Sequence, residues 1–394
     1  MSDSPVGGSL RMYFWTSGLT ALLVLTGIVM FNYLVDPYLI HQWNTTLVDR
    51  PSPAQQKIMP WVKTYAAYRY RPEVVFLGSS RAEIGLPTNF APFAGKRVFN
   101  LALAGGTLGD AINMLQHTSV FHRPEIVVWG LDYGWLFSEK IGNTDFDRTL
   151  VAQGPSYPLW RAFLNIKRSI SMNMTVDAVK IVLGVSEQSC RSLLATYGQK
   201  STQCLERIMK NEGGTAKAFE VVLKKNSPSS PPVNEDATLQ TLDRVTQDYC
   251  RQGTIFRFFI QPNHALAEIA NWTERWEEKE NWKKTLVNVI EARRQEGCDI
   301  RLFDFSGFNS ITTEDIPQVT GKDTMKYFWE QSHYRSEVGH KILEQLFATA
   351  PQAESSDFGI ELSAGTIQQH LHNLRKKRSQ YIKNHPRETK NLIP

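Results

Sequence analysis

Cysteine is scarce in this chain of 394 residues. The four cysteines, Cys190, Cys204, Cys250 and Cys298, form no Cys-x-x-Cys pair and have no histidines at zinc-binding spacing. Zinc modules and Cys-x-x-Cys redox motifs are therefore excluded, and we expect no metal or other cofactor. Cys190 and Cys204 are close enough in sequence for a disulfide in an oxidising compartment, and the alternative is four free, buried thiols.

The body of the chain lacks an excess of positive charge. The net charge is +5, but the segment from His370 to Pro394 contains seven Lys and Arg against one acid, Glu388. That segment carries +6 and residues 1–369 carry −1, which argues against a nucleic-acid partner. Disorder throughout is also excluded, because 42% of the residues are hydrophobic and 11% aromatic, enough to form a core.

Charge is absent between Met12 and Val35, a stretch of 24 residues. As a helix it would be about 36 Å long, enough to cross a hydrocarbon core of about 30 Å. We therefore expect a transmembrane anchor over residues 12–35. A cleaved signal peptide is the first alternative, although no small-residue cleavage site follows the stretch, and a buried core helix is the second.

The charges that flank this stretch predict its orientation. Arg11 precedes it, and no Lys or Arg follows until Arg50, which favours a short cytoplasmic N-terminus over residues 1–11. The main domain then lies outside the cytoplasm, on the periplasmic side of the inner membrane if the cell is Gram-negative.

After a proline-containing connector, residues 36–70, the pattern is typical of an α/β domain with a mainly parallel sheet. We expect that domain over residues 71–350, with a largely helical insertion at about 135–250, followed by a solvated basic tail over 351–394. An alternative for the tail is binding to anionic lipid headgroups or an acidic polymer. The expected strands are 73–77, 97–101, 125–130, 255–260 and 299–304, and the expected helices are 107–120, 264–296 and 336–348.

Three motifs in this pattern carry residues that can do chemistry. Gly78-Ser79-Ser80-Arg81 directly follows the first strand, where a sharp turn exposes a serine hydroxyl. Glu330 and His333 are spaced so that the carboxylate can reach Nδ1 of the imidazole and leave Nε2 for a nucleophile. Asn100 to Gly106 follows the second strand, and its glycines can present backbone N–H groups to an oxyanion. Each motif alone also fits an ordinary turn or a surface pair.

Together the motifs resemble the SGNH (GDSL-like) hydrolase superfamily. The family's nucleophile stands in a Gly-x-Ser, here Gly78-Ser79-Ser80, and its second block has Gly five residues after Asn, here Asn100 and Gly105. Its last block is a carboxylate-x-x-His, here Glu330 to His333. The resemblance covers about residues 73–134 and 255–346.

This resemblance implies a three-layer α/β/α, flavodoxin-like fold and a serine hydrolase site. Ser80 would be the nucleophile, His333 the base and Glu330 its orienting partner. The backbone N–H groups of Ser80 and Gly105 would form the oxyanion hole. Asp132 departs from the family pattern, because the third block ordinarily supplies an Asn side chain to that hole and a carboxylate does not donate a hydrogen bond.

Three further residues are candidates for substrate binding: Arg81, Asp132 and His264. Arg81 could hold an anionic substrate, and His264 follows a strand. Solvated-turn, structural and helix-capping roles remain the respective alternatives. Asp304 is expected to be structural.

The anchored layout resembles membrane-bound SGNH-like bacterial proteins related to cell-envelope O-acyltransferase accessory proteins. It implies an extracytoplasmic esterase or O-acyltransferase that moves an acetyl or other short acyl group on a cell-envelope polysaccharide. A membrane-bound acyltransferase would be the donor partner and a carbohydrate polymer the acceptor. The alternative is a non-catalytic binding or assembly component of such a polysaccharide system, which Asp132 favours.

Overall fold

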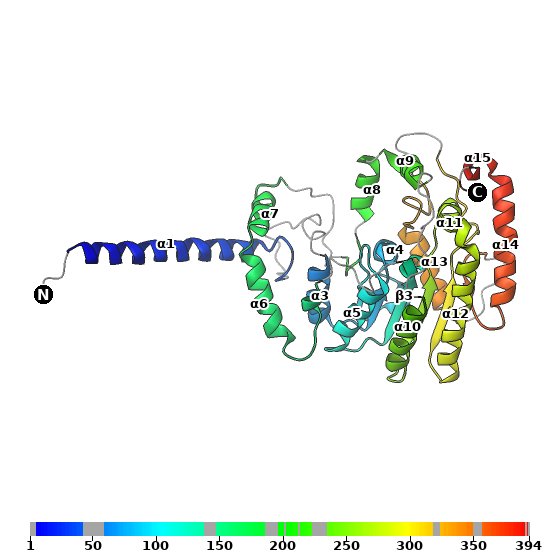
Figure 1. The fold of residues 1–394 in the computed structure, drawn as a ribbon, viewed down its shortest axis with the longest axis horizontal. Helices are drawn as coiled ribbons and strands as arrows, with labels where there is room; N and C mark the ends of the chain where they lie inside the picture. The colour runs from blue at the N-terminus through cyan, green and yellow to red at the C-terminus, as the bar shows by residue number, and fades with distance from the viewer. Residues whose placement is uncertain are drawn as a thin grey trace.

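The computed structural model describes residues 5–41, 59–137, 147–185, 196–200, 202–211, 213–222, 235–317, 324–349, 357–390 and 392. One long helix, α1 (Pro5–Val35), projects from a folded α/β body (Figure 1). From Ser9 to Val35 this helix is long and apolar enough to cross a membrane. Only 11% of an apolar stretch of 18 residues within it is buried. The predicted apolar helix is therefore confirmed, and it begins before Met12.

Six strands form one sheet in the order β2-β1-β3-β4-β5-β6. The first five pair in parallel, and β6 pairs antiparallel with β5. The five strands expected from the sequence are confirmed to within two residues at each end, and β6 was not expected. Their bounds are β1 (Val74–Leu77), β2 (Val98–Asn100), β3 (Ile126–Leu131), β4 (Ile255–Ile260), β5 (Ile300–Asp304) and β6 (Ile360–Glu361).

Helices cover both faces of the sheet, because neighbouring residues of each strand point to opposite sides. Val75, Val127 and Phe258 pack with one group of helices, whereas Val74 and Val128 pack with another. The first group comprises α3 (Met59–Tyr70), α5 (Leu108–Ser119), α10 (Glu235–Cys250), α12 (Trp276–Gln295) and α14 (Ile367–Asn384). The second comprises α4 (Ser80–Gly85) and α13 (Ser336–Leu346).

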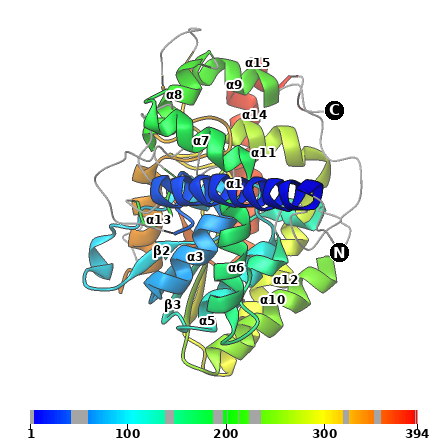
Figure 2. The same ribbon diagram turned by 90° about the vertical axis from the view of Figure 1, so that its left-hand side faces the viewer.

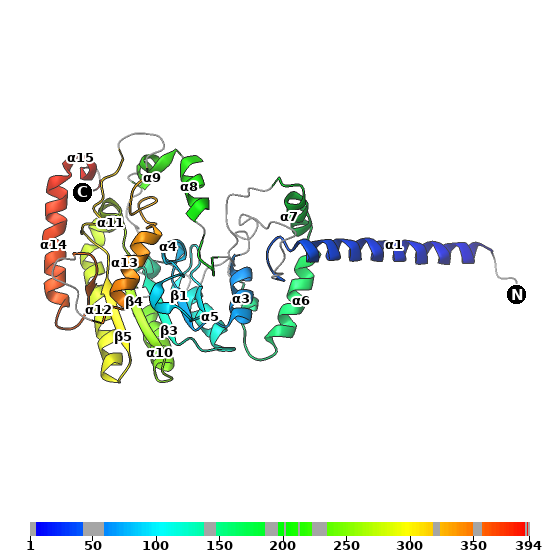
Figure 3. The same cartoon turned by 180° about the vertical axis from the view of Figure 1, so that it is seen from behind.

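The remaining elements flank this arrangement (Figures 1 and 3), and three of them add side chains to its core: Phe93, Tyr133 and Phe219. The flanking elements are the helices α6 (Tyr157–Ser169), α7 (Met172–Val182), α8 (Thr202–Asn211), α9 (Gly214–Val222), α11 (Ala265–Trp272) and α15 (Pro386–Thr389), and the short 3-10 helices η1 (Ala91–Phe93), η2 (Tyr133–Phe137), η3 (Arg148–Leu150) and η4 (Thr273–Arg275).

Two of the predicted boundaries cut through packed structure. Helix α3, inside the expected connector, buries Val62 and Ala66 in the main core. Helix α10, inside the expected insertion, buries Leu239 and Leu242 there. Both helices therefore belong to the body of the α/β domain.

The expectation of a solvated tail is wrong for the residues from Phe358 onward. Strand β6 pairs with β5, and α14 places Leu371 and Leu374 in the core. Arg375 forms an ion pair with Glu280 of α12, with 2.8 Å between Nε and Oε1. The apolar residues of α14 form a stripe at helical spacing. The many basic residues of the helix make its overall composition polar, so composition alone does not indicate that one face is buried.

A disulfide joins Cys250 at the end of α10 to Cys298 before β5. It fixes one edge of the core, and the sequence did not indicate this pairing. The predicted pair Cys190–Cys204 cannot be assessed, since Cys190 and the side chain of Cys204 lie outside the described residues.

Candidate active site

The site lies where the strand order reverses, between β1 and β3. In an open parallel sheet the connections from two such strands leave in opposite directions, which opens a crevice at their carboxyl ends. Ser80 follows β1 and Asp132 follows β3. The topology therefore brings Ser80 and Asp132 to the same edge of the sheet.

Ser80 is the first residue of α4, and the turn before it requires glycine. Gly78 has φ +145°, and a Cβ on it would lie 2.8 Å from Cβ of Ala82 and 3.1 Å from the carbonyl oxygen of Gly130. A larger residue would push the turn away from β3. The serine is thus held on a backbone that passes close to the neighbouring strand.

Asn100 secures this turn from below. The side chain is fully buried, and Nδ2 donates to the carbonyl oxygens of Ala82 (2.9 Å) and Leu86 (3.3 Å), while Oδ1 accepts from the N–H of Ala102 (3.1 Å). Asn100 therefore positions α4, which begins with Ser80, relative to the segment that leads from Ala102 to Gly105. Asn100 itself does not line the cavity.

The structure brings Ser80, His333 and Glu330 together across 253 residues of sequence. Nε2 of His333 lies 2.7 Å from Oγ of Ser80. Nδ1 of the same ring bonds Oε1 of Glu330. This is the geometry in which a carboxylate fixes the imidazole tautomer and leaves Nε2 to accept the serine proton.

Glu330 is held as a carboxylate. Burial alone would raise its pKa, but hydrogen bonds from His333 and Ser332 outweigh burial and lower the pKa below its ordinary value. The N–H of His333 donates to Oε1 at 2.7 Å, and the N–H of Ser332 donates to Oε2 at 3.2 Å. A charge retained here stabilises the imidazolium that forms when His333 takes a proton.

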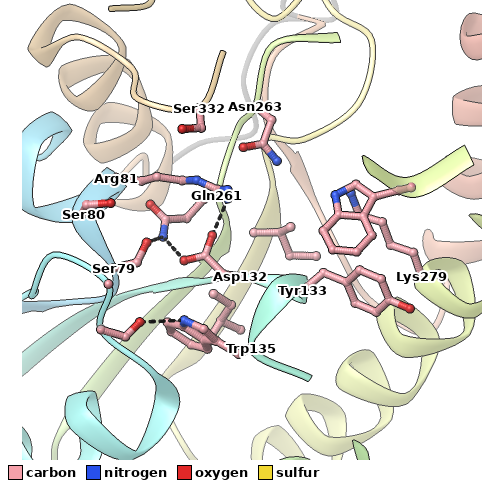
Figure 4. Close-up of a pocket in the computed structure, with 16 residues that line it drawn as sticks. Ser79, Ser80, Arg81, Asp132, Tyr133, Trp135, Gln261, Asn263, Lys279 and Ser332 are labelled. Carbon is pink, nitrogen blue, oxygen red and sulfur yellow. Dashed lines mark hydrogen bonds and ion pairs between the residues drawn. The ribbon is translucent and has the colours of Figure 1, made fainter. Parts of the chain in front are cut away.

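Arg81 and Asp132 form a second set of contacts beside Ser80 (Figure 4). Nη1 of Arg81 lies 2.5 Å from Oδ1 of Asp132, and Gln261 donates from Nε2 to Oδ2 at 2.8 Å. Gln261 also reaches Oγ of Ser79 (3.3 Å) and accepts from the hydroxyl of Tyr334 (3.3 Å). Both carboxylate oxygens of Asp132 are thus occupied by protein donors.

A cavity of about 280 Å³ opens over these groups. Ser80, Arg81 and Asp132 line it, and so does Gly105, which has φ +66°. Three aromatic and two polar residues also line it: Tyr133, Trp135, Trp272, Asn263 and Lys279. Figure 4 shows Tyr133 and Lys279 on the side away from Ser80.

Two polar residues that line the cavity, Asn263 and Lys279, both bond the buried carboxylate of Glu268. Lys279 bonds Glu268, and Asn263 donates from Nδ2 to the other oxygen of Glu268 at 3.2 Å. Burial lowers the pKa of Lys279, and the Glu268 charge opposes that shift. Oδ1 of Asn263 is buried without a protein hydrogen-bond partner.

His264 does not belong to this site. The ring is fully buried, Nδ1 accepts from the N–H of Leu266 (3.2 Å) at the start of α11, and Nε2 lies 2.7 Å from the carbonyl oxygen of Glu314. Burial lowers its pKa to about 4. His264 therefore caps a helix, and its expected contact with substrate is wrong.

Sequence reasoning assigned no role to Gln261, Asn263, Trp135 or Lys279. Gln261 and Asn263 directly follow β4, so the rule that ligands bind at the carboxyl ends of strands could have indicated them. Lys279 lies on α12 and Trp135 on η2, and only the folded chain brings these two helices to the cavity. In the part of the chain that the structure describes, no three His, Cys, Asp or Glu side chains come together as metal ligands.

Comparison with known proteins adds no relative: no model of a protein family matches the chain, and no curated protein matches it.

Proposed function

We propose that this protein is a membrane-anchored, extracytoplasmic serine esterase or O-acyltransferase of the SGNH type that acts on a cell-envelope polysaccharide. One observation carries the proposal: the continuous hydrogen-bond chain from Ser80 through His333 to Glu330, beside a cavity at the carboxyl ends of the strands. A histidine with only a packing role does not require Nε2 within hydrogen-bonding distance of a serine that lines a cavity.

The reaction follows from this geometry. Oγ of Ser80 attacks the acyl carbonyl as its proton passes to Nε2 of His333, and Glu330 stabilises the resulting imidazolium. The tetrahedral intermediate collapses, His333 returns the proton to the leaving alcohol, and an acyl-enzyme remains. A second hydroxyl, from water or from a glycan, then gives its proton to His333 and takes the acyl group, which restores Ser80.

The negative oxygen of the intermediate needs donors other than Asp132. That carboxylate bonds Arg81 and Gln261 and is no donor. We assign the oxyanion hole to the backbone N–H groups of Ser80 and Gly105. Arg81, whose guanidinium carries five N–H donors, also lines the cavity, where its charge is paired with Asp132 and its remaining N–H groups are further candidate donors.

The cavity wall supports a carbohydrate acceptor. Trp135 and Trp272 are partly buried and add apolar ring surface to the lining, and Asn263, Lys279 and Ser332 add polar groups. Sugar rings combine both requirements, with C–H faces that pack on aromatic rings and hydroxyls that donate. The sheet order supports the family assignment, because the first five strands follow the 2-1-3-4-5 order of flavodoxin-like folds, to which the three-layer SGNH fold belongs.

The location rests on α1 and on the disulfide. Helix α1 is exposed and apolar enough to cross a membrane. We propose that it anchors the chain in the inner membrane with the N-terminus in the cytoplasm. The Cys250–Cys298 disulfide fits an oxidising compartment such as the periplasm. A membrane-bound acyltransferase would supply the acyl group.

A fluorophosphonate probe tests the nucleophile in the full-length protein. We expect wild type to be labelled and Ser80→Ala to lose the label, while Ser379→Ala, an exposed serine on α14, labels like wild type. Hydrolysis of short acyl esters, measured with and without an oligosaccharide acceptor, then separates esterase from transferase. Absence of label in folded wild type, or equal labelling of Ser80→Ala, would overturn the proposal.

The second candidate function is a non-catalytic, polysaccharide-binding component. Asp132 favours it, because an Asn that would donate to the oxyanion is replaced by a carboxylate, and losing one such donor costs about 10²–10³ in rate. Glycan binding by a wild-type protein that neither labels nor hydrolyses esters would support this candidate.

A further inference from the structure

Helices α6 and α7 carry apolar side chains on their outer surfaces. Large apolar residues are ordinarily buried in a domain of this size, and contiguous exposed apolar patches mark interaction sites. Here Leu159 is 79% exposed and Met172 74%. Their exposed neighbours are Phe163 and Ile166 on α6, and Val179 and Val182 on α7.

Helix α6 is amphipathic with the polar side inward. Its buried face holds the polar residues Arg161, Asn165 and Ser169 together with Tyr157 and Leu164. Arg161 donates to Oγ1 of Thr64 at 2.9 Å, and Asn165 donates to the carbonyl oxygen of Ile40 at 3.0 Å. These polar side chains therefore form hydrogen bonds inside the protein, and the face that remains outside is largely apolar. This is the arrangement expected for a helix whose outer surroundings are apolar.

The pair is fastened to the end of α1. Nδ2 of Asn32, in the last turn of α1, donates to the carbonyl oxygen of Ser169 (2.7 Å) and to Oγ1 of Thr175 (2.8 Å). The hydroxyl of Tyr38 donates to Asp177 of α7 at 2.6 Å. Figures 1 and 3 both show α6 running across the direction of α1 at the point where α1 meets the body, and Figure 2 shows α6 and α7 on either side of α1.

The exposed length of α1 gives the depth of this junction. Every residue from Ser9 to Gly27 is exposed, and the first partly buried one is Ile28. The charge-free part of this exposed length, Met12 to Gly27, has 16 residues and spans about 24 Å. The end of α1 therefore approaches the far side of a hydrocarbon core roughly 30 Å thick. If α1 crosses the bilayer, α6 and α7 therefore lie at the level of the headgroups where it emerges.

From these observations we infer that α6 and α7 form a platform (residues 157–182) that inserts its apolar face into the outer surface of the bilayer around α1. The cations around this face fit that surface, because Lys167 and Lys180 are exposed, whereas Asp177, the one acid of the platform, is buried. Basic, apolar helices of this kind lie in the interface of anionic membranes. The stacked rings of Trp160 and Phe163 are suited to the headgroup level.

This inference rests on α1 spanning the membrane but not on the chemistry of Ser80. It adds a second, lateral contact that would limit tilting of the catalytic body about the anchor. The active-site cavity would then be held at a restricted height above the membrane, where a membrane-bound acyl donor could reach it.

Site-specific photo-crosslinking tests the platform. The purified full-length protein is reconstituted in phosphatidylethanolamine–phosphatidylglycerol vesicles with p-benzoylphenylalanine in place of Phe163 on α6, Val179 on α7, Leu22 on α1 or Ser379 on α14. All four positions are exposed, so the fold should tolerate the change, which a thermal unfolding midpoint close to that of wild type verifies. We expect lipid adducts at Leu22, Phe163 and Val179, and none at Ser379.

The outcomes separate the two ideas. A lipid adduct at Leu22 without one at Phe163 and Val179 would overturn the platform and leave the anchor intact. Adducts from Phe163 or Val179 to a second copy of the chain, in place of lipid, would also overturn it. Absence of a lipid adduct at Leu22 would overturn the anchor, and the platform with it.

Discussion

Two carboxylate–histidine pairs lie in the body of this protein, and they differ in what surrounds them. Glu330 bonds Nδ1 of His333, and Nε2 is directed at Ser80. Asp304 instead bonds Nε2 of His370 at 2.8 Å. Each carboxylate also accepts from a serine two residues further on, Ser332 and Ser306 respectively.

The differences decide the chemistry. The side chain of His333 is 27% exposed and contacts Ser80, which lines the cavity. Asp304 is fully buried and is also bonded by Lys283, with 2.5 Å between Nζ and Oδ2. Burial would raise the pKa of Asp304, but Lys283 and His370 hold that pKa far below its ordinary value. The same pair of residue types thus leaves Nε2 directed at a serine hydroxyl in one case. In the other it forms a fixed charge cluster in which a lysine neutralises the acid.

The largest expected effect is on catalysis by the first pair. Glu330→Gln removes the negative charge that stabilises the imidazolium and selects the tautomer, so kcat for ester hydrolysis should fall about 10⁴-fold with a small change in stability. Steady-state kinetics on a short acyl ester measure this. Glu330→Asp, which keeps the charge, should retain more activity than Glu330→Gln. An unchanged kcat in Glu330→Gln would show that the first pair is as structural as the second.

The corresponding change in the second pair should act on stability. Asp304→Asn leaves Lys283 buried opposite a neutral side chain, and removing one partner of a buried ion pair costs about 3–5 kcal/mol. Urea unfolding of the detergent-solubilised protein measures this loss. The double variant Asp304→Asn with Lys283→Met should recover part of it, because no unpaired charge remains. Loss of activity in Asp304→Asn that is still folded would contradict the structural role.

The response to acid should follow the same division. The folded-state pKa of Asp304 lies below its unfolded value of about 3.9, so its contribution to stability is complete above that value and is lost as the pH falls. We expect the difference in unfolding free energy between wild type and Asp304→Asn to shrink below about pH 4. Urea midpoints at pH 7, 5, 4 and 3 measure it, and a difference that stays constant would refute the assignment.

The two serines provide the smallest and most closely matched comparison. Ser306→Ala removes a 2.6 Å hydrogen bond to Asp304 and should cost about 1 kcal/mol of stability with no change in kcat. Ser332→Ala removes a 3.1 Å hydrogen bond to Glu330, and its effect should appear in kcat. Unfolding and kinetic measurements on both variants are needed, and a kcat effect from Ser306→Ala would blur the distinction between the pairs.

The parts of the fold that the sequence predicted are those with short-range signals. The strands of the parallel sheet are continuous apolar runs, and Ser80, Glu330 and His333 stand in compact motifs at strand ends or before a helix. Helix α14 escaped prediction because its basic residues outnumber the stripe that it buries. His264 was assigned to the site because it follows a strand, but its ring turns into the core to cap α11.

The sequence by itself predicted the apolar helix, the five parallel strands, and the serine and carboxylate–histidine motifs that meet in the site, because each of these depends on neighbours within a few positions. Only the tertiary structure decided which histidine faces a nucleophile, that Asp132 is bonded by Arg81 and Gln261, and that α6 turns its polar side inward. These outcomes depend on contacts between residues far apart in the chain, and their energies come from burial and charge pairing, which no local pattern records.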